Sequence, residues 1–224
     1  MTVAIAIVAH TKRAEQAHQL MDTVGAQYLS MDDGTLGCTA NHIRCWTYLA
    51  KQPTEWSLVL EDDAQPIHGF RDQLDLALDA APTEVVSLYL GRERPVWMEF
   101  GGRGSAQRVQ PVIIKALARA DEQGASFITA PKLLHAVAVA VRTNLIDSML
   151  KHVQESKQPI DFAIGDWCTA NHHQVAYTYP SLCDHEDGPT VIRRHPDGEP
   201  RHQPRKAHKV GTADAWTKRS VTLQ

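Results

Sequence analysis

Three consecutive carboxylates follow a strand-forming run in the first third of the chain. Residues 56–60 are mostly strand formers, and Glu61, Asp62 and Asp63 come directly after them. Adjacent negative charges repel one another, so ending a buried strand on them costs stability unless a cation or a polar ligand lies at that edge. Carboxylate oxygens select hard divalent cations such as Mg²⁺ and Mn²⁺. The alternative is an acidic turn that water solvates.

The residues that follow the carboxylates favour a binding site. Pro66 and Gly69 close a loop, and residues 70–78 have apolar side chains at helical spacing. The carboxylates therefore lie at the carboxyl end of a strand in a β-loop-α unit. Open α/β sheets bind their ligands at such edges.

Strands and helices alternate through the part of the chain around this unit. We expect strands at 3–9, 27–31, 56–60 and 85–90, and helices at 12–24, 39–50 and 70–78. Farther along, we expect helices at 111–123, 144–153 and 161–167, and strands at 135–141 and 174–179. This alternation predicts an α/β fold with a mostly parallel sheet and helices on both faces.

Two segments depart from the alternation. Residues 92–108 contain three glycines and no clear periodicity, and form either a mobile lid or a plain excursion.

Residues 193–224 carry eight Lys or Arg against three Asp or Glu, a net charge of +5, whereas the remainder carries −8. We expect one domain over 1–192 and a basic, proline-containing tail over 193–224, poorly ordered or draped on the body. The tail either is a solvated appendage or neutralises phosphates.

Composition sets the broad class of protein. The chain has 224 residues, 43% of them hydrophobic and 22% charged, which suits one globular domain. No stretch approaches the roughly 20 apolar residues of a membrane-spanning helix, and a basic leader is absent, so we expect a cytoplasmic protein. The cysteines at 38, 45, 168 and 183 form no CxxC pair, which indicates buried free thiols rather than a zinc site or disulfides.

The order of three motifs adds a resemblance to a family. An early strand over 5–12 precedes the segment Leu-Gly-Cys-Thr-Ala-Asn-His at 36–42, and the acidic motif follows at 59–63. This order resembles the lipooligosaccharide-type (LPS) glycosyltransferases, a GT-A family that also includes collagen galactosyltransferases. Asn41 stands where that family usually has serine. Looser matches at 138–142, 159–161 and 180–192 extend the resemblance over about 3–192, and the tail lies outside it.

The resemblance implies a metal site and a donor site. Asp63 would bind the divalent metal, while Glu61 and Asp62 would contact the ribose, phosphates or sugar of a nucleotide-sugar donor. His185 resembles the late histidine that GT-A enzymes often add to the metal, and imidazole suits Mn²⁺ better than Mg²⁺. Glu186 and Asp187 are alternatives to His185, which would then be a surface residue.

The resemblance also suggests a catalytic base. Inverting transfer needs a carboxylate that takes the proton of the attacking hydroxyl. Asp166 resembles the acidic helix start that carries this base in many GT-A enzymes, and Trp167 beside it could form the wall of a sugar site. Asp161 is the rival base, or else the N-cap of the short helix that follows it.

Further residues are expected at the nucleotide. The resemblance implies contacts from His10, Thr11 and Arg13 at the end of the first strand; the alternative is a helix cap by Thr11 and a solvated charge at Arg13. Asp32 and Asp33 could face uracil or ribose, or could simply form an Asp-Gly turn.

These expectations combine into a metal-dependent, inverting GT-A glycosyltransferase that uses Mn²⁺ or Mg²⁺. It would move a hexose, most readily from a UDP-hexose, to a hydroxyl on a glycan, a protein or another acceptor; the acidic body disfavours extended contact with nucleic acid. A sugar nucleotidyltransferase is a rival, although residues 9–13 lack the glycine-rich phosphate loop usual for it. A non-catalytic sugar-binding module is the second rival, and the intact acidic motif argues against it.

Overall fold

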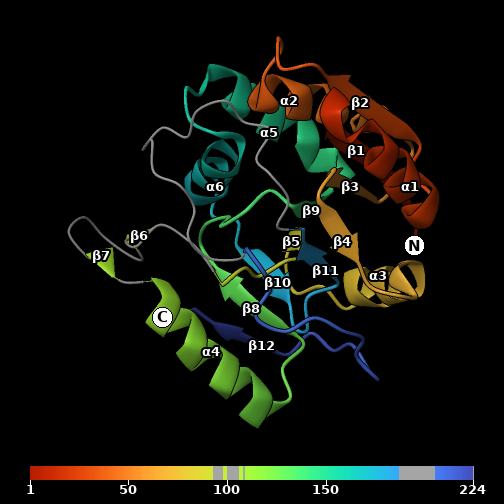
Figure 1. The fold of residues 1–224 in the computed structure, drawn as a ribbon. Coiled ribbons are helices and arrows are strands. Elements are labelled where there is room, and N and C mark those ends of the chain that lie inside the picture. Colours follow the sequence, from red (N-terminus) through yellow and green to blue (C-terminus); the bar gives the residue numbers. More distant parts are fainter. Residues whose placement is uncertain (93–97, 100–105, 108, 187–204, 224) are drawn as a thin grey trace.

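Helices cover both faces of a mixed sheet (Figure 1). The carboxylates lie at the carboxyl end of one of its inner strands. The computed structural model describes residues 1–92, 98–99, 106–107, 109–186 and 205–223. Within them the main sheet has eight strands, and two small sheets have two strands each. The predicted lid or excursion at 92–108 lies largely outside the described residues.

The first part of the chain follows the predicted alternation within a few residues. The elements are β1 (Val3–His10), a 3-10 turn (Thr11–Arg13), α1 (Ala14–Val24), β2 (Tyr28–Asp32), α2 (Cys38–Leu49), β3 (Trp56–Glu61), α3 (Phe70–Asp79) and β5 (Val85–Ser87). Strands β3, β1 and β2 are neighbours and parallel, so their carboxyl ends meet at one edge.

The second part contains several elements that the periodicity does not predict. The large elements are α4 (Val109–Gln123), β8 (Phe127–Ala130), β9 (Ala138–Arg142), a 3-10 turn (Thr143–Leu145), α5 (Ile146–Glu155), α6 (Ile160–Ala170), β10 (Val175–Thr178) and β12 (Ser220–Thr222). The small sheets pair β4 (Ala64–Pro66) with β11 (Cys183–His185), and β6 (Met98–Glu99) with β7 (Ala106–Gln107).

The sheet order is β12-β8-β10-β5-β9-β3-β1-β2, and four of its seven neighbouring pairs are parallel. The mostly parallel sheet is therefore confirmed, with two reversals: β8 and β12 run opposite to β10, and β9 runs opposite to both of its neighbours. Strand β9 lies antiparallel between β3 and β5, with Leu60 opposite Ala138. Its apolar side chains are buried on both faces, which requires a central position. The turn into β9 thereby reaches the acidic motif, and the Val137 carbonyl accepts a hydrogen bond from the Glu61 amide at 2.9 Å.

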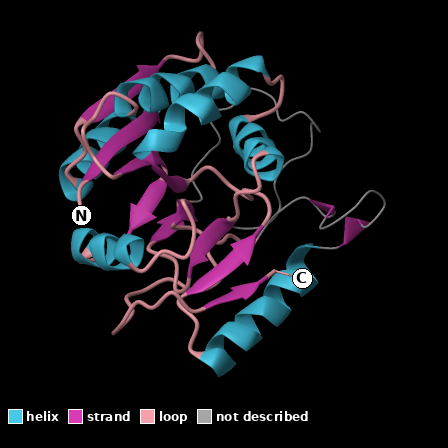
Figure 2. Ribbon diagram, turned by 180° about the vertical axis from the view of Figure 1, so that it is seen from behind, coloured by secondary structure: helices cyan, strands magenta, loops and turns pink. Residues whose placement is uncertain are grey.

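Two hydrophobic cores lie on the two faces of the sheet. Alternate residues of β1 divide between them, with Ala6 and Val8 on one side and Ile5 and Ile7 on the other. Helices α2, α4, α5 and α6 pack against the first face, and α1 and α3 against the second (Figure 2). None of the described helices combines the length and apolarity needed to cross a membrane.

The described part of the predicted tail lies against the body. Strand β12 pairs in parallel with β8 at the edge of the sheet, with Val221 opposite Ile128. Val221 and Leu223 are buried. The predicted boundary at residue 192 falls in the interval 187–204, which the structure does not describe.

A buried asparagine holds the carboxyl ends of β1 and β2 together. Asn41 of α2 is only 2% exposed. Its Nδ2 donates to the carbonyl oxygens of Ala9 (3.0 Å) and Ser30 (3.1 Å), and its Oδ1 accepts from the Ser30 hydroxyl at 2.6 Å. Buried polar groups need such partners, so Asn41 fixes helix α2 at the edge that carries the carboxylates.

We expect Asn41→Ala to lower the free energy of unfolding by about 1–3 kcal/mol, because the buried Ser30 and Ala9 groups lose their partner. Urea unfolding followed by circular dichroism measures this loss. Asn144→Ala, at an exposed asparagine, is the matched control and should leave stability nearly unchanged. Equal stability of Asn41→Ala and the parent protein would contradict the role given to Asn41.

Candidate active site at the carboxyl edge of the sheet

One guanidinium group joins the last two carboxylates of the acidic motif. Asp62 and Asp63 are 8% and 7% exposed. Nη1 of Arg13 donates to Asp62 Oδ1 at 2.8 Å and to Asp63 Oδ2 at 2.7 Å. The backbone amide of His10 adds a bond to Asp62 Oδ2 at 2.8 Å. The predicted cluster is therefore a buried, partly neutralised site, and Arg13 is not a solvated charge.

The two aspartates differ in their electrostatics. Burial raises the pKa of Asp62 above its usual value, even though His10 and Arg13 oppose this rise. Burial also disfavours the charged form of Asp63, but His185 and Arg13 outweigh it and lower the pKa of Asp63. Asp63 is thus the carboxylate whose negative charge the site stabilises.

The small sheet brings His185 to Asp63. Strands β4 and β11 place His185 opposite Ala64, directly after the acidic motif. His185 is 1% exposed, and its Nε2 lies 3.3 Å from Asp63 Oδ2. Among the described residues, the other oxygen of Asp63, Oδ1, is buried without a hydrogen-bond partner. The two residues predicted to bind metal are therefore neighbours.

Of the two alternatives to His185, Glu186 directs its carboxylate away from Asp63. The backbone amide of Glu186 donates to the Asp63 carbonyl oxygen at 2.8 Å. Its carboxylate turns toward α1, where Oε2 accepts from Gln16 Nε2 at 2.9 Å. Asp187 lies outside the described residues.

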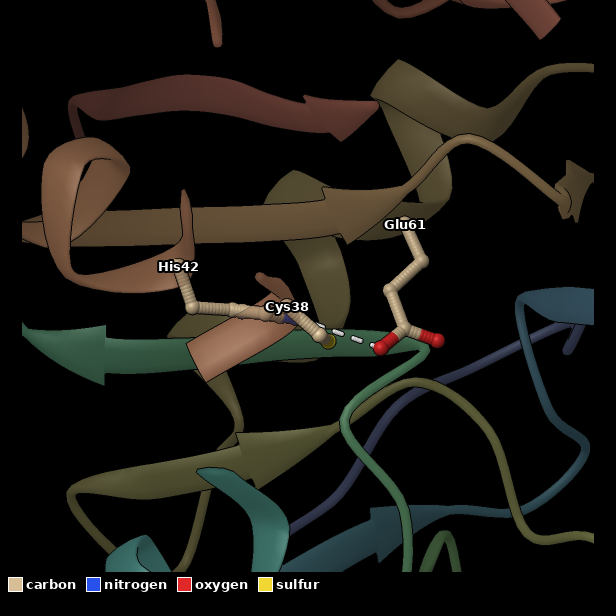
Figure 3. A group of neighbouring side chains, drawn as sticks. All are labelled: Cys38, His42 and Glu61. Carbon is tan, nitrogen blue, oxygen red and sulfur yellow. Dashed lines mark hydrogen bonds and ion pairs between the residues drawn. The ribbon is translucent and has the colours of Figure 1, made fainter. Parts of the chain in front are cut away.

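Glu61 contacts the other motif that supports the family resemblance. Its Oε1 lies 3.2 Å from Nε2 of His42, which is 1% exposed, and Cys38 lies one helical turn before His42 on α2 (Figure 3). Burial would lower the pKa of His42, but hydrogen bonding with Cys38 and Glu61 raises it to about 10. The contact between His42 Nε2 and Glu61 Oε1 thus orients the Glu61 carboxylate. The sequence shows the two motifs but not this contact.

Asp32 and Asp33 both shape the loop before α2. The Asp32 carboxylate accepts from the backbone amides of Leu36 (3.0 Å) and Gly37 (2.9 Å), and Asp33 accepts from the amide and hydroxyl of Thr35. These backbone hydrogen bonds outweigh burial and lower the pKa of Asp32. Asp32 and Asp33 therefore form the Asp-Gly turn, which was one of the two interpretations of these residues.

The same loop lines an open pocket of about 450 Å³ next to β1 and β2. Thr11, Asp32, Asp33 and Arg44 contribute to its wall. Thr11 does not cap a helix; His10 does so instead, since its Nδ1 accepts from the Lys12 amide at 3.1 Å. The position of Arg44 in this wall could not be read from the helical pattern.

The two candidate bases lie on α6. Asp166 has a side chain 46% exposed, and its Oδ1 lies 3.4 Å from Lys132 Nζ. Asp161 lies in the first turn and accepts from the Phe162 amide at 3.0 Å. It is not the N-cap, because the helix begins at Ile160 after Pro159. Neither aspartate is among the described contacts of Asp63.

The expected sugar-binding role of Trp167 is wrong. Its side chain is 1% exposed and belongs to the core shared by α5 and α6, where Nε1 donates to the Ser148 hydroxyl at 3.2 Å. The neighbouring Gly165 packs so closely on the turn before β9 that a Cβ atom would lie 3.1 Å from the Leu133 nitrogen. Helix α6 is therefore anchored against the turn that leads to β9.

A lysine of the carboxyl-terminal segment reaches the candidate metal site. Lys206 Nζ donates to the His185 carbonyl oxygen at 2.6 Å and to Gln65 Oε1 at 3.2 Å, and it lies 3.6 Å from Asp184 Oδ2. The charge of the tail is visible in the sequence. The contact of this particular lysine is not, because residues 205–209 reach it by pairing with distant loops.

Several solved structures are distantly similar to this chain, among them the following three. The bifunctional IspDF from Campylobacter jejuni has a TM-score of 0.45 at 9% identity over 80% of this chain, which spans about half (49%) of that one. A197 from STIV has a TM-score of 0.48 at 8% identity, covering 96% of this chain and 98% of that one. A glycosyltransferase involved in the glycosylation of the major capsid of PBCV-1 has a TM-score of 0.35 at 12% identity, covering 69% and 68%.

Comparison of sequences is more specific. No curated protein matches the chain. The model of glycosyltransferase family 25 (LPS biosynthesis protein) matches residues 4–100, a little under half of the chain. The match includes β1, the Asn41–His42 motif and the acidic motif at the end of β3. It confirms the expected resemblance, because this part of the chain is similar to glycosyltransferase family 25.

Proposed function

We propose that this protein is a glycosyltransferase that depends on Mn²⁺ or Mg²⁺ and moves a hexose from a nucleoside diphosphate, in the first place UDP, to an acceptor hydroxyl with inversion. The observation that carries the proposal is the meeting of Asp63 and His185. They come from distant parts of the sequence, both are buried, and their Oδ2 and Nε2 atoms lie 3.3 Å apart.

The residues present suit a divalent cation. Asp63 and His185 would hold it, since the carboxylate has a buried oxygen without a partner in the described part of the chain. One imidazole with carboxylate oxygens favours Mn²⁺ over Ca²⁺ or Mg²⁺. When bound, the cation would stabilise the negative charge that the diphosphate leaving group gains as the glycosidic bond breaks.

The surrounding side chains support binding of a diphosphate and a nucleoside. Arg13 contacts Asp63 and Lys206 contacts the His185 carbonyl oxygen, so both place positive charge beside this pair. The pocket bounded by Thr11, Asp32, Asp33 and Arg44 is adjacent to Arg13 along the chain and could receive the ribose and base. Glu61, oriented by His42, would bind a hydroxyl of the ribose or sugar.

For the proton we propose Asp166 as the base, with Asp161 as the alternative. Asp166 is half exposed and lies on the helix anchored to the turn before β9, so an acceptor could approach it from solvent. Lys132 Nζ lies 3.4 Å from Asp166 Oδ1 and would help to hold the carboxylate in position.

We expect Asp63→Asn to weaken Mn²⁺ binding by more than about tenfold and to abolish transfer. Losing outer partners of a metal already costs 10–100-fold in affinity, and a ligand should cost more. Isothermal titration with Mn²⁺ measures the affinity, and circular dichroism checks the fold. Asp79→Asn, on the exposed surface of α3, is the control. Unchanged Mn²⁺ affinity in Asp63→Asn would overturn the metal assignment.

If Asp166 is the base, Asp166→Asn should slow transfer by about 10²–10⁴-fold, the usual contribution of general-base catalysis, while donor binding stays nearly constant. Asp161→Asn, on the same helix, is the matched variant and should keep most of the activity. The opposite pattern would exchange the two roles, and full activity of both variants would exclude each of them as the base.

Lys206→Gln tests the contribution of the carboxyl-terminal segment. Removing this charge should weaken UDP binding in the presence of Mn²⁺, and the loss should shrink as salt rises, because charges are screened beyond about 10 Å at 0.1 M. Titration of UDP at low and high salt measures both effects, with Lys151→Gln on α5 as the control. Equal UDP affinity of the Lys206 variant and the parent protein at low salt would refute the role.

A further inference from the structure

A second group of metal-binding side chains lies beside the first but does not include its ligands. Cys38, His42 and Glu61 each offer one ligand atom, and these atoms all lie within 4.8 Å of one another. In Figure 3 the three side chains point toward a common region between the start of α2 and the end of β3. Asp63 and His185 are not members of this group.

We propose that Cys38, His42 and Glu61 form a binding site for a soft divalent cation, in the first place Zn²⁺. Zinc takes one sulfur, one imidazole nitrogen and one carboxylate oxygen readily, and sites with three protein ligands leave a fourth position open for water. A thiolate selects zinc over Mg²⁺ and Mn²⁺. The site shares Glu61 with the proposed donor site, but Asp63 and His185, the proposed ligands of the catalytic cation, are not part of it.

The backbone brings the three ligands together. Cys38 and His42 are four residues apart at the start of α2, a spacing that places both side chains on one face of the helix. Glu61 is the last residue of β3, and its Oε1 is already 3.2 Å from His42 Nε2. The bonds of Asn41 to β1 and β2 hold this end of α2 in place.

The three ligand side chains differ in solvent exposure in a way that lets a cation enter from solvent. His42 is 1% exposed, Glu61 is partly exposed and Cys38 is exposed, whereas the other three cysteines are buried. Zinc can therefore reach the thiol without opening the core. Cys38 and His42 would coordinate the cation as thiolate and neutral imidazole.

Titration with Co²⁺ tests the site directly, because a cobalt ion bound to a thiolate gives a charge-transfer absorption in the near ultraviolet. We expect this absorption to saturate at one equivalent in the parent protein and to vanish in Cys38→Ser. Cys45→Ala removes a buried thiol from the same helix and should keep it. Absence of the band from the parent protein, or its persistence in Cys38→Ser, would overturn the proposal.

Asp63→Asn separates this site from the proposed catalytic cation. The cobalt–thiolate absorption should remain in Asp63→Asn, whereas Mn²⁺ binding should be lost. If the absorption disappears with Asp63→Asn, the two groups are one site and the proposal fails. If Asp63→Asn keeps its Mn²⁺ affinity while Cys38→Ser loses the cobalt–thiolate absorption, the zinc site stands. Only the proposed metal assignment for the transfer reaction then fails.

Protection from alkylation provides a second measurement that does not need a spectral band. Iodoacetamide should modify Cys38 in the native protein, and Zn²⁺ should slow this reaction while Mg²⁺ does not. In His42→Ala and in Glu61→Gln, the Zn²⁺ concentration that gives half-maximal protection should rise by more than about tenfold. Peptide mass spectrometry locates the modified cysteine. A rate of Cys38 modification that Zn²⁺ leaves unchanged would refute the site.

Discussion

Charge neutralisation at the end of β3 is the constraint on which the site depends. Two buried aspartates follow a strand whose side chains are buried, and their repulsion needs a nearby cation. Arg13 provides one, with a single nitrogen within 2.8 Å of both carboxylates. The position of Arg13 follows from β1, which runs parallel to β3 and ends beside it. The 3-10 turn after β1 then directs the arginine back over the acidic residues.

Two strands with unusual positions complete this arrangement. Strand β9 inserts between β3 and β5 and brings its preceding turn to the Glu61 amide. Strand β11 pairs with β4 and delivers His185 to Asp63. The acidic motif thus receives its neighbours from four separate regions of the chain: the end of β1, helix α2, the turn before β9 and strand β11. The buried imidazoles of His42 and His185 contact Glu61 and Asp63 respectively, so the carboxylates at the two ends of the motif each have a histidine of their own.

The sequence predicts the elements of the first part well because their periodicity is strong. The boundaries of β1, α2 and β3 agree within about two residues, and the acidic motif lies where the strand pattern places it. The antiparallel position of β9 could not be predicted, since an apolar run shows burial but not direction. Strands β4 and β11 have three residues each, too few to give a pattern.

In the candidate site too, some features can be predicted from the sequence and others cannot. Local motifs indicate Asp62 and Asp63 as site residues, and the resemblance adds His185. The sequence does not reveal that Arg13 bridges the aspartates or that Lys206 contacts His185, because each contact depends on how distant segments pair. The error over Trp167 has a related cause: the pattern shows a helix but not which of its faces meets the core.

The pairing of β12 with β8 has a consequence for how the protein is made. Strand β8 needs β12 as its neighbour on the edge of the sheet, yet β12 is synthesised long after β8, α5 and α6. Until then a growing chain carries an unpaired strand edge with the apolar residues Phe127 and Ile128, a surface prone to wrong pairing with other chains. This edge of β8 therefore stays open until β12 has left the ribosome, and chaperones that shield such edges would help this protein more than one whose sheet pairs strands close in sequence.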